Sequence, residues 1–174
     1  MLMRGRRLVF TGDGKGKTTA AMGMACRALG HGLPVLVAQF IKGRDTGEEK
    51  LLAAQPGLTF LQLGLGFLPR TEGPELARHR AAAQDGLQRV ATELVAGQWR
   101  LVVLDEICTA VARGLLAEAA VLAALERAQP ETVIVLTGRG ATSGLIAYAD
   151  TVTEMRCVKH GYATGIAAQP GVEW

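Results

Sequence analysis

The sequence has few aromatic residues and no long apolar run. Aromatic residues make up 5% of the 174 residues, so a core has to be built from aliphatic side chains, which the hydrophobic fraction of 49% supplies. No apolar run approaches the roughly 18 residues that a membrane-spanning helix needs, and the N-terminus lacks the apolar segment of a signal peptide. We therefore expect a cytoplasmic protein that does not insert into a membrane.

Residues that hold metals or act as nucleophiles are also scarce. The three cysteines, Cys26, Cys108 and Cys157, have no metal-ligand spacing, and their odd number indicates reduced thiols rather than a disulfide framework. The histidines at positions 31, 79 and 160 share no ligand spacing either, and no Ser/His/Asp or Cys/His arrangement is evident. Without a protein nucleophile, we expect any reaction to take place between bound molecules.

Charge is present in moderation and without a strong pattern. The net charge is +3 and the isoelectric point is near 9.0, but only Arg4, Arg6 and Arg7 form a basic cluster. The other basic residues are spread along the chain, so nucleic-acid binding is not indicated.

Apolar segments of two kinds alternate along the chain. Short runs rich in leucine and β-branched residues predict strands at 7–11, 34–40, 58–63, 101–105, 132–137 and 151–156. Alanine-rich segments of helical period predict helices at 17–29, 74–96, 115–128 and 142–149. This alternation predicts one α/β domain over residues 1–174, with a mostly parallel sheet and helices on both faces.

A glycine-rich loop lies between the first predicted strand and the first predicted helix. Its glycines allow consecutive backbone N–H groups to face inward, and the helix N-terminus adds partial positive charge. Lys17 is expected to reach the phosphates as a point charge, and the Thr18 hydroxyl to bind Mg²⁺. The residues assigned to the nucleotide here are Gly12, Asp13, Gly14, Lys15, Gly16, Lys17, Thr18 and Thr19. We predict ATP with Mg²⁺ and a P-loop NTPase-like (RecA-like) three-layer sandwich; the alternative is a turn that merely joins strand to helix.

The loop departs from the usual P-loop spacing. Only three residues separate Gly12 from Gly16, where four usually precede the final glycine and lysine, and Lys15 is an extra cation. The phosphates are therefore not expected to lie as they do in ordinary P-loop enzymes.

Charged residues follow three of the other predicted strands. Asp105 and Glu106 end an apolar strand, a pattern that holds or positions Mg²⁺ beside a phosphate loop; which of the two contacts the ion stays open. Lys42 and Arg139 follow two more strands and are expected to reach anionic groups at the same edge of the sheet. The alternative for both is a solvated charge at a strand end.

Phe67 lies in a segment with glycines on its N-terminal side and a proline on its C-terminal side. Such a segment after a predicted strand predicts a mobile loop in which Phe67 could contact a flat ligand. An equally open alternative is that Phe67 anchors the core.

Taken in order, these motifs resemble the corrinoid adenosyltransferase family, the cob(I)yrinic acid a,c-diamide adenosyltransferases. The resemblance covers essentially the whole chain, and the shortened loop is itself a family feature. The residues that carry it are 11–19, 30–32, 39–43, 66–67, 103–106, 137–140 and 158–160, together with the closing 168–174.

The resemblance implies transfer of the 5′-deoxyadenosyl group of ATP to the Co(I) of a reduced corrinoid, with release of inorganic triphosphate. It implies that ATP lies reversed on the loop, that Lys17, Glu106 and Phe67 are catalytic, and that Phe67 faces the corrin. Thr18 and Glu106 are the implied Mg²⁺ ligands, with Asp105 beside them. Arg27 is assigned to the nucleotide site. A flavoprotein reductant for cobalt and a homodimer are the implied partners.

Two residues differ from the resemblance. Pro69 stands where relatives often have a tryptophan, and Thr109 stands where an aromatic residue is frequent, so the corrin pocket is expected to differ in shape. The alternatives to the transferase are a small P-loop ATPase or kinase and, third, a non-catalytic nucleotide- or corrinoid-binding module. No activation segment supports kinase chemistry.

Overall fold

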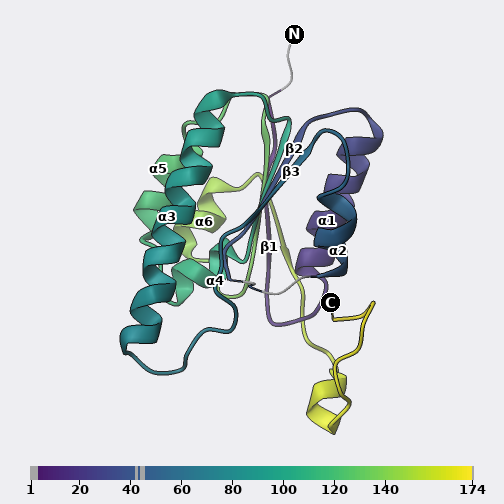
Figure 1. Cartoon of the computed structure of the whole chain (residues 1–174), viewed down its shortest axis with the longest axis vertical. Coiled ribbons are helices and arrows are strands. Elements are labelled where there is room, and N and C mark those ends of the chain that lie inside the picture. Colours follow the sequence, from purple (N-terminus) through teal and green to yellow (C-terminus); the bar gives the residue numbers. More distant parts are fainter. Residues whose placement is uncertain (1–3, 42, 44–45, 174) are drawn as a thin grey trace.

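The computed structural model describes residues 4–41, 43 and 46–173, and its centre is one six-stranded sheet (Figure 1). All neighbouring strands pair in parallel, in the order β3-β2-β4-β5-β1-β6. The strands are β1 (Arg7–Thr11), β2 (Val35–Gln39), β3 (Leu58–Gln62), β4 (Leu101–Asp105), β5 (Val133–Thr137) and β6 (Thr151–Glu154). The six predicted strands are confirmed, and all of their carboxyl ends meet at one edge of the sheet.

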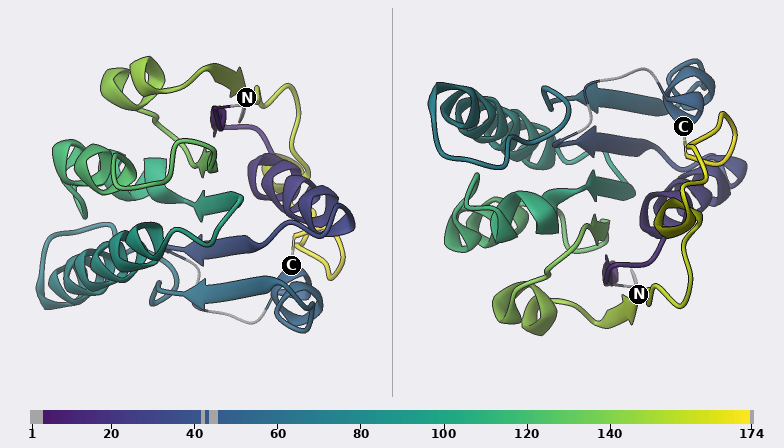
Figure 2. Two further views of the ribbon diagram at one scale, coloured as in Figure 1. Left: turned by 90° about the horizontal axis from the view of Figure 1, so that it is seen from above. Right: turned by 90° about the horizontal axis from the view of Figure 1, so that it is seen from below.

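Helices cover both faces of the sheet, which confirms the three-layer α/β sandwich (Figures 1 and 2). One face carries α1 (Lys17–Gly30) and α2 (Gly47–Leu52). The other carries α3 (Pro74–Ala96), α4 (Ile107–Ala112), α5 (Glu118–Leu125) and α6 (Ser143–Tyr148). A 3₁₀ helix, η1 (Gly161–Thr164), follows β6.

Two short helices were not predicted, and one predicted helix is shorter than expected. The helices α2 and α4 have six residues each, too few for a periodic pattern to identify. The helix predicted over 115–128 begins at Glu118, because Leu115 and Leu116 instead bury their side chains in the connection from α4.

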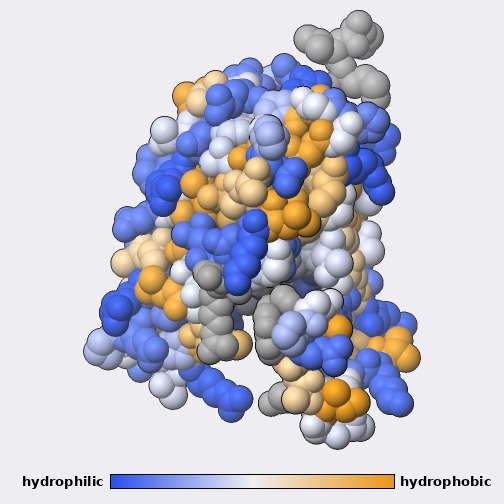
Figure 3. Space-filling model, turned by 45° about the vertical axis from the view of Figure 1, so that its right-hand side comes forward, coloured by the Kyte–Doolittle hydropathy of each residue, from blue (hydrophilic) through white to orange (hydrophobic). Residues whose placement is uncertain are grey.

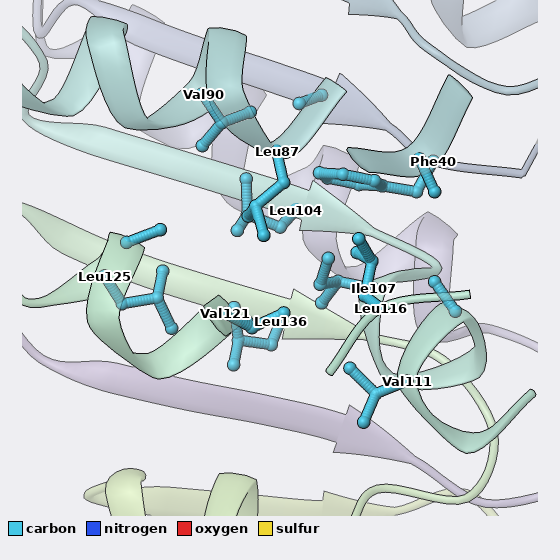
Figure 4. Packing of buried hydrophobic residues seen from close by; sticks show 14 of the residues in the cluster. Phe40, Leu87, Val90, Leu104, Ile107, Val111, Leu116, Val121, Leu125 and Leu136 are labelled. Carbon is cyan, nitrogen blue, oxygen red and sulfur yellow. The ribbon is translucent and has the colours of Figure 1, made fainter. Parts of the chain in front are cut away.

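The sheet separates two apolar cores, because successive side chains of a strand point to opposite faces. In β4, Val102 and Leu104 belong to the core under α3 and α5, whereas Leu101 and Val103 belong to the core under α1. Figure 4 shows the first core, in which Leu87 of α3 and Leu125 of α5 face the sheet. The central strands are buried on both faces, so the positions of their carboxyl ends are fixed.

The periphery is much more open. All four residues of the edge strand β6 are exposed. In the view of Figure 3, apolar and hydrophilic residues are interspersed over the surface. None of the helices in the described part of the chain is long and apolar enough to cross a membrane.

Candidate active site

The glycine-rich loop and the ends of three neighbouring strands lie together at the carboxyl edge of the sheet. The sheet order places β2, β4, β5 and β1 side by side, so residues that close these strands meet although they are far apart in sequence. A cleft of about 450 Å³ opens there, lined by residues 13–19 together with Glu106 and Arg139. Parallel α/β sheets bind ligands at this edge.

The glycines of the loop are required by its backbone and by its neighbours. Gly12 and Gly16 have φ of 94° and 113°, a backbone conformation that residues other than glycine rarely adopt. A Cβ on Gly12 would lie 2.5 Å from the Met155 carbonyl oxygen, and a Cβ on Gly14 would lie 2.7 Å from it. The Gly14 N–H donates to this same oxygen at 2.7 Å, so the loop is held against the chain that leaves β6.

Lys17 begins α1 and lies beneath the loop. Its side chain is buried, and its Nζ donates to the carbonyl oxygens of Gly12 at 2.7 Å and Gly14 at 2.6 Å. Burial lowers the pKa of the Lys17 ammonium below its usual range, and the positive charge of Arg139 lowers it further. An anion in the cleft would compensate both effects, because it favours the charged form.

Asp105 closes β4 and is the hub of a buried hydrogen-bond network. Its side chain is fully buried. Its Oδ1 accepts from the hydroxyls of Thr18 at 2.8 Å and Thr137 at 2.7 Å, and its Oδ2 accepts from Gln39 Nε2 at 2.9 Å. Both carboxylate oxygens therefore hold protein groups, and one of these is the threonine of the loop.

Gln39 and Thr137 were not assigned a role from the sequence. Gln39 is the register partner of Asp105 across β2 and β4, and Thr137 closes β5 on the other side. The available signal was a polar residue at the end of an otherwise apolar strand. It identifies a partner of Asp105 only when the strand order is known.

Glu106 follows Asp105 and faces the cleft. Its φ of 63° makes it the one non-glycine residue with positive φ among the described residues, a conformation found disproportionately at functional sites. Its N–H donates to Thr137 Oγ1 at 2.9 Å, and its Oε2 accepts from Thr109 Oγ1 at 2.5 Å. Thr109 Oγ1 in turn accepts the Arg139 N–H at 2.8 Å. The carboxylate is thus held at the cleft surface by the loop that carries Arg139.

The other predicted residues fall into different places. Asp13, Lys15, Thr19 and Arg139 line the cleft together with Lys17 and Thr18. Arg27 is exposed in the last turn of α1, outside the cleft lining, so its role stays a prediction. Lys42 lies outside the described residues.

Phe67 lies in the connection after β3, at the same edge of the sheet as the loop. It is 83% exposed, so the alternative of a core anchor was wrong. The connections after β2 and β3 are in contact, because the Gly66 N–H donates to the Ile41 carbonyl oxygen at 2.9 Å. Phe67 is not among the residues that line the cleft, but the backbone next to it is fixed at the same edge of the sheet.

The C-terminal part of the chain contributes lining residues that the sequence did not indicate. His160, Gly171, Val172 and Glu173 line the cleft, as do Gly47 and Glu48 at the start of α2. A carboxylate oxygen of Glu173 lies 3.8 Å from the Lys15 ammonium. The segments 158–160 and 168–174 carried the family resemblance, but nothing in the sequence placed them at the cleft, because their place depends on the path of the chain after β6.

The cysteines behave as free thiols. Cys26 and Cys157 are exposed and Cys108 is buried, with none of them in a disulfide. Burial, aided by the negative charge of Glu106, raises the pKa of the Cys108 thiol to about 12, so it stays protonated beside the site.

Known proteins resemble this chain over nearly its whole length. The family model described as ATP:corrinoid adenosyltransferase BtuR/CobO/CobP matches residues 3–174. A corrinoid adenosyltransferase of Pseudomonas aeruginosa is 45% identical over 175 residues, which cover 98% of this chain and 84% of that protein. The corrinoid adenosyltransferase CobA of Salmonella typhimurium is 40% identical over 98% of this chain and 86% of its own. A corrinoid adenosyltransferase of Escherichia coli K12 is 39% identical, with the same coverage of 98% and 86%. The chain therefore belongs to the ATP:corrinoid adenosyltransferase family.

Proposed function

We propose a role for each part of the cleft in the reaction of this enzyme, an ATP:corrinoid adenosyltransferase. The triphosphate of ATP lies against residues 12–19, C5′ points out toward a corrinoid, and Co(I) attacks C5′. The electron pair of cobalt forms the Co–C bond while the C5′–O bond breaks, and its electrons leave with inorganic triphosphate. The observation that carries this proposal is the buried Lys17 under a glycine loop whose cleft opens at the carboxyl edge. A P-loop ATPase or kinase is not favoured, because the relatives are named adenosyltransferases.

The protein groups act mainly on the leaving group. Negative charge builds on the triphosphate oxygen as the C5′–O bond breaks, so the loop N–H groups and Lys17 stabilise the transition state more than bound ATP. Orientation adds to this, since a fixed triphosphate places C5′ in line with cobalt. No protein nucleophile is needed.

The residues at the cleft fit Mg²⁺ bound together with phosphates. No group of three or more Cys, His, Asp or Glu side chains among the described residues could hold a metal alone. Mg²⁺ bound to nucleotides usually takes one or two protein oxygens and completes its shell with phosphates and water. We propose the Thr18 hydroxyl and the Glu106 carboxylate as those oxygens. When bound, the ion would supply positive charge to the departing triphosphate.

We propose that Asp105 positions Thr18 rather than contacting the ion. The Thr18 hydroxyl donates its proton to Asp105 Oδ1 at 2.8 Å, which leaves the oxygen lone pairs for the cleft. Asp105 itself is fully buried and is not among the residues that line the cleft. The carboxylate thereby fixes the rotamer of a ligand.

The corrinoid is proposed to lie over the exposed Phe67 at the same edge. An aromatic ring at 83% exposure offers a flat apolar face to the lower side of a corrin. Thr109 stands where the family resemblance leads one to expect an aromatic residue. Its hydroxyl donates to the Glu106 carboxylate and accepts the Arg139 N–H. It therefore organises the phosphate side of the site.

The surrounding roles belong to the same proposal. Co(I) has to be generated by an electron donor, and we propose a flavoprotein for this role. We also propose a homodimer of single-domain protomers in the cytoplasm, where ATP is available. Sedimentation analysis of the purified chain tests the dimer.

Product analysis tests the proposed reaction. The enzyme is incubated anaerobically with ATP, Mg²⁺ and chemically reduced corrinoid, the cobalt–carbon product is followed by its absorption spectrum, and the phosphate product is identified chromatographically. We expect adenosylated corrinoid and inorganic triphosphate in equal amounts. Formation of ADP and phosphate without triphosphate would overturn the proposal.

A further inference from the structure

The C-terminal segment, residues 155–173, forms a wall of the cleft to which the proposed reaction assigns no role. The segment begins against the glycine-rich loop, where Met155 accepts the Gly14 N–H at 2.7 Å. It then turns through η1 and returns, so that His160 and Glu173 also line the cleft. Figures 1 and 2 show this yellow segment beside the starts of α1 and α2. The loop is thus contacted by both ends of the segment.

The carboxylate of Glu173 is held in place by its own turn. Its Oε2 accepts the Gln169 N–H at 2.9 Å, and its backbone N–H donates to the Gln169 carbonyl oxygen at 3.0 Å. Gly171, with φ of 79°, gives the turn a conformation that favours glycine. The other oxygen, Oε1, lies 3.8 Å from Lys15 Nζ. The acidic group is therefore fixed in position facing the extra cation of the loop.

A triphosphate and Glu173 would compete for Lys15. Lys17 already donates to two carbonyl oxygens under the loop, whereas the Lys15 side chain is 44% exposed at the rim. A triphosphate in the loop would attract the Lys15 ammonium and would be repelled by the Glu173 carboxylate. Each anion therefore weakens the hold of Lys15 on the other, and this coupling is reciprocal.

We propose that Glu173 sets the affinity of the loop for triphosphate and promotes release of the inorganic triphosphate product. This inference rests on the proposed function, since it requires triphosphate in the loop. ATP is also held through its nucleoside, but free inorganic triphosphate is held by charge alone. A fixed competing carboxylate thus limits how long the product stays bound after the cobalt–carbon bond has formed.

Calorimetric titration with inorganic triphosphate and Mg²⁺ tests the proposal. We expect Glu173→Gln to lower the dissociation constant about two- to fivefold at low salt, the range of a partly exposed ion pair. The effect should shrink at high salt, because partly exposed charges are screened. It should be smaller when Lys15→Gln is already present, because the competition for the cation is gone and only the direct repulsion between the two anions remains. Both side chains are partly exposed, so neither change removes core packing.

A matched control uses an acidic residue elsewhere. Glu72 pairs with Arg80 at 3.7 Å outside the cleft, and Glu72→Gln should leave triphosphate binding unchanged. Multiple-turnover rates give a second readout: Glu173→Gln should be inhibited by added triphosphate at lower concentrations than wild type.

Two results would overturn the inference. One is an unchanged or raised dissociation constant in Glu173→Gln, and the other is a gain in affinity that is equally large in the Lys15→Gln background. Wild-type protein that binds no triphosphate at all would instead overturn the proposed function.

Discussion

The floor and the outer wall of the cleft are built in opposite ways. The floor holds Lys17, and Asp105 supports the floor from behind through Thr18. Both side chains are buried, and their polar atoms bond to other protein groups at 2.6 to 2.9 Å. The wall holds Lys15 and Glu173, which are partly exposed. Phe67 lies outside the cleft lining at the same edge of the sheet and is largely exposed. Charged groups that are already fixed at the floor can stabilise a transition state without rearranging. A less tightly held wall allows substrates to enter and products to leave.

The difference follows from what supports each region. Asp105 ends a strand that is paired on both sides, so the sheet fixes its backbone within a narrow range. Glu173 depends on a local turn and one ion pair of 3.8 Å. Substitutions at the floor should therefore have larger effects than substitutions in the wall, and the two groups should affect different measured quantities.

The largest effect is expected for Lys17→Ala. Removing a charge aimed at the departing triphosphate costs about 2 to 4 kcal/mol of barrier, or roughly 30- to 1,000-fold in rate. Single-turnover rates of adenosylation at saturating ATP measure it. Lys50→Ala, which removes an exposed lysine from the last turn of α2, should leave the rate unchanged. Near-normal turnover in Lys17→Ala would contradict a floor built for the leaving group.

A smaller effect, on stability as well as on activity, is expected for Asp105→Asn. The amide keeps the size of the carboxylate but cannot accept from Thr18, Thr137 and Gln39 at both of its ends, so a buried donor is left without a partner. The free energy of unfolding should fall by about 1 to 3 kcal/mol, and the Mg²⁺ concentration for half-maximal rate should rise. Urea denaturation of the ligand-free protein and a Mg²⁺ titration measure the two effects.

Asp85→Asn is the control for this change. Asp85 is exposed on α3. Asp85→Asn should change the free energy of unfolding by no more than about 0.5 kcal/mol and should leave the Mg²⁺ concentration for half-maximal rate unchanged. If Asp105→Asn were as stable as wild type, Asp105 could not be the hub of the floor.

The smallest effect is expected for Phe67→Ala, on the exposed side of the site. Stability should be unchanged because the ring is 83% exposed. Turnover should fall about two- to tenfold with corrinoids whose lower axial ligand is bound, and less with corrinoids that lack this ligand. Steady-state assays with both kinds of corrinoid measure the ratio, and Leu65→Ala, at a neighbouring residue that is 50% exposed, is the control. Equal losses with both corrinoids would remove the proposed lower-face role.

Much of the floor could be predicted from the sequence, because its residues belong to short local patterns. The loop at 11–19 and the pair Asp105 and Glu106 each follow an apolar strand, and a parallel sheet brings such positions to one edge. Gln39 and Thr137 could not be predicted as partners of Asp105, since nothing local fixes the order of the strands.

The wall was harder to predict because connections have no repeating pattern. For Phe67 the sequence left two alternatives of equal weight, and only the exposure of the ring decides between them. Glu173 belongs to the closing segment that carried the resemblance, but its approach to Lys15 could not be predicted, because it depends on the path of the whole segment after β6. The short helices α2 and α4 were missed for a related reason, namely that six residues give too little periodicity.

The position of β1 has a consequence for the order in which the protein assembles. This first strand lies between β5 and β6, and its residue Arg7 pairs in register with Ile134. The glycine-rich loop therefore leaves the ribosome well before β5 and β6, the two strands that flank its supporting strand. Pairings between such distant segments form slowly. We infer that the phosphate-binding loop is completed only after β5 and β6 have paired with β1, so a chain that stops before β5 should not bind ATP through the loop.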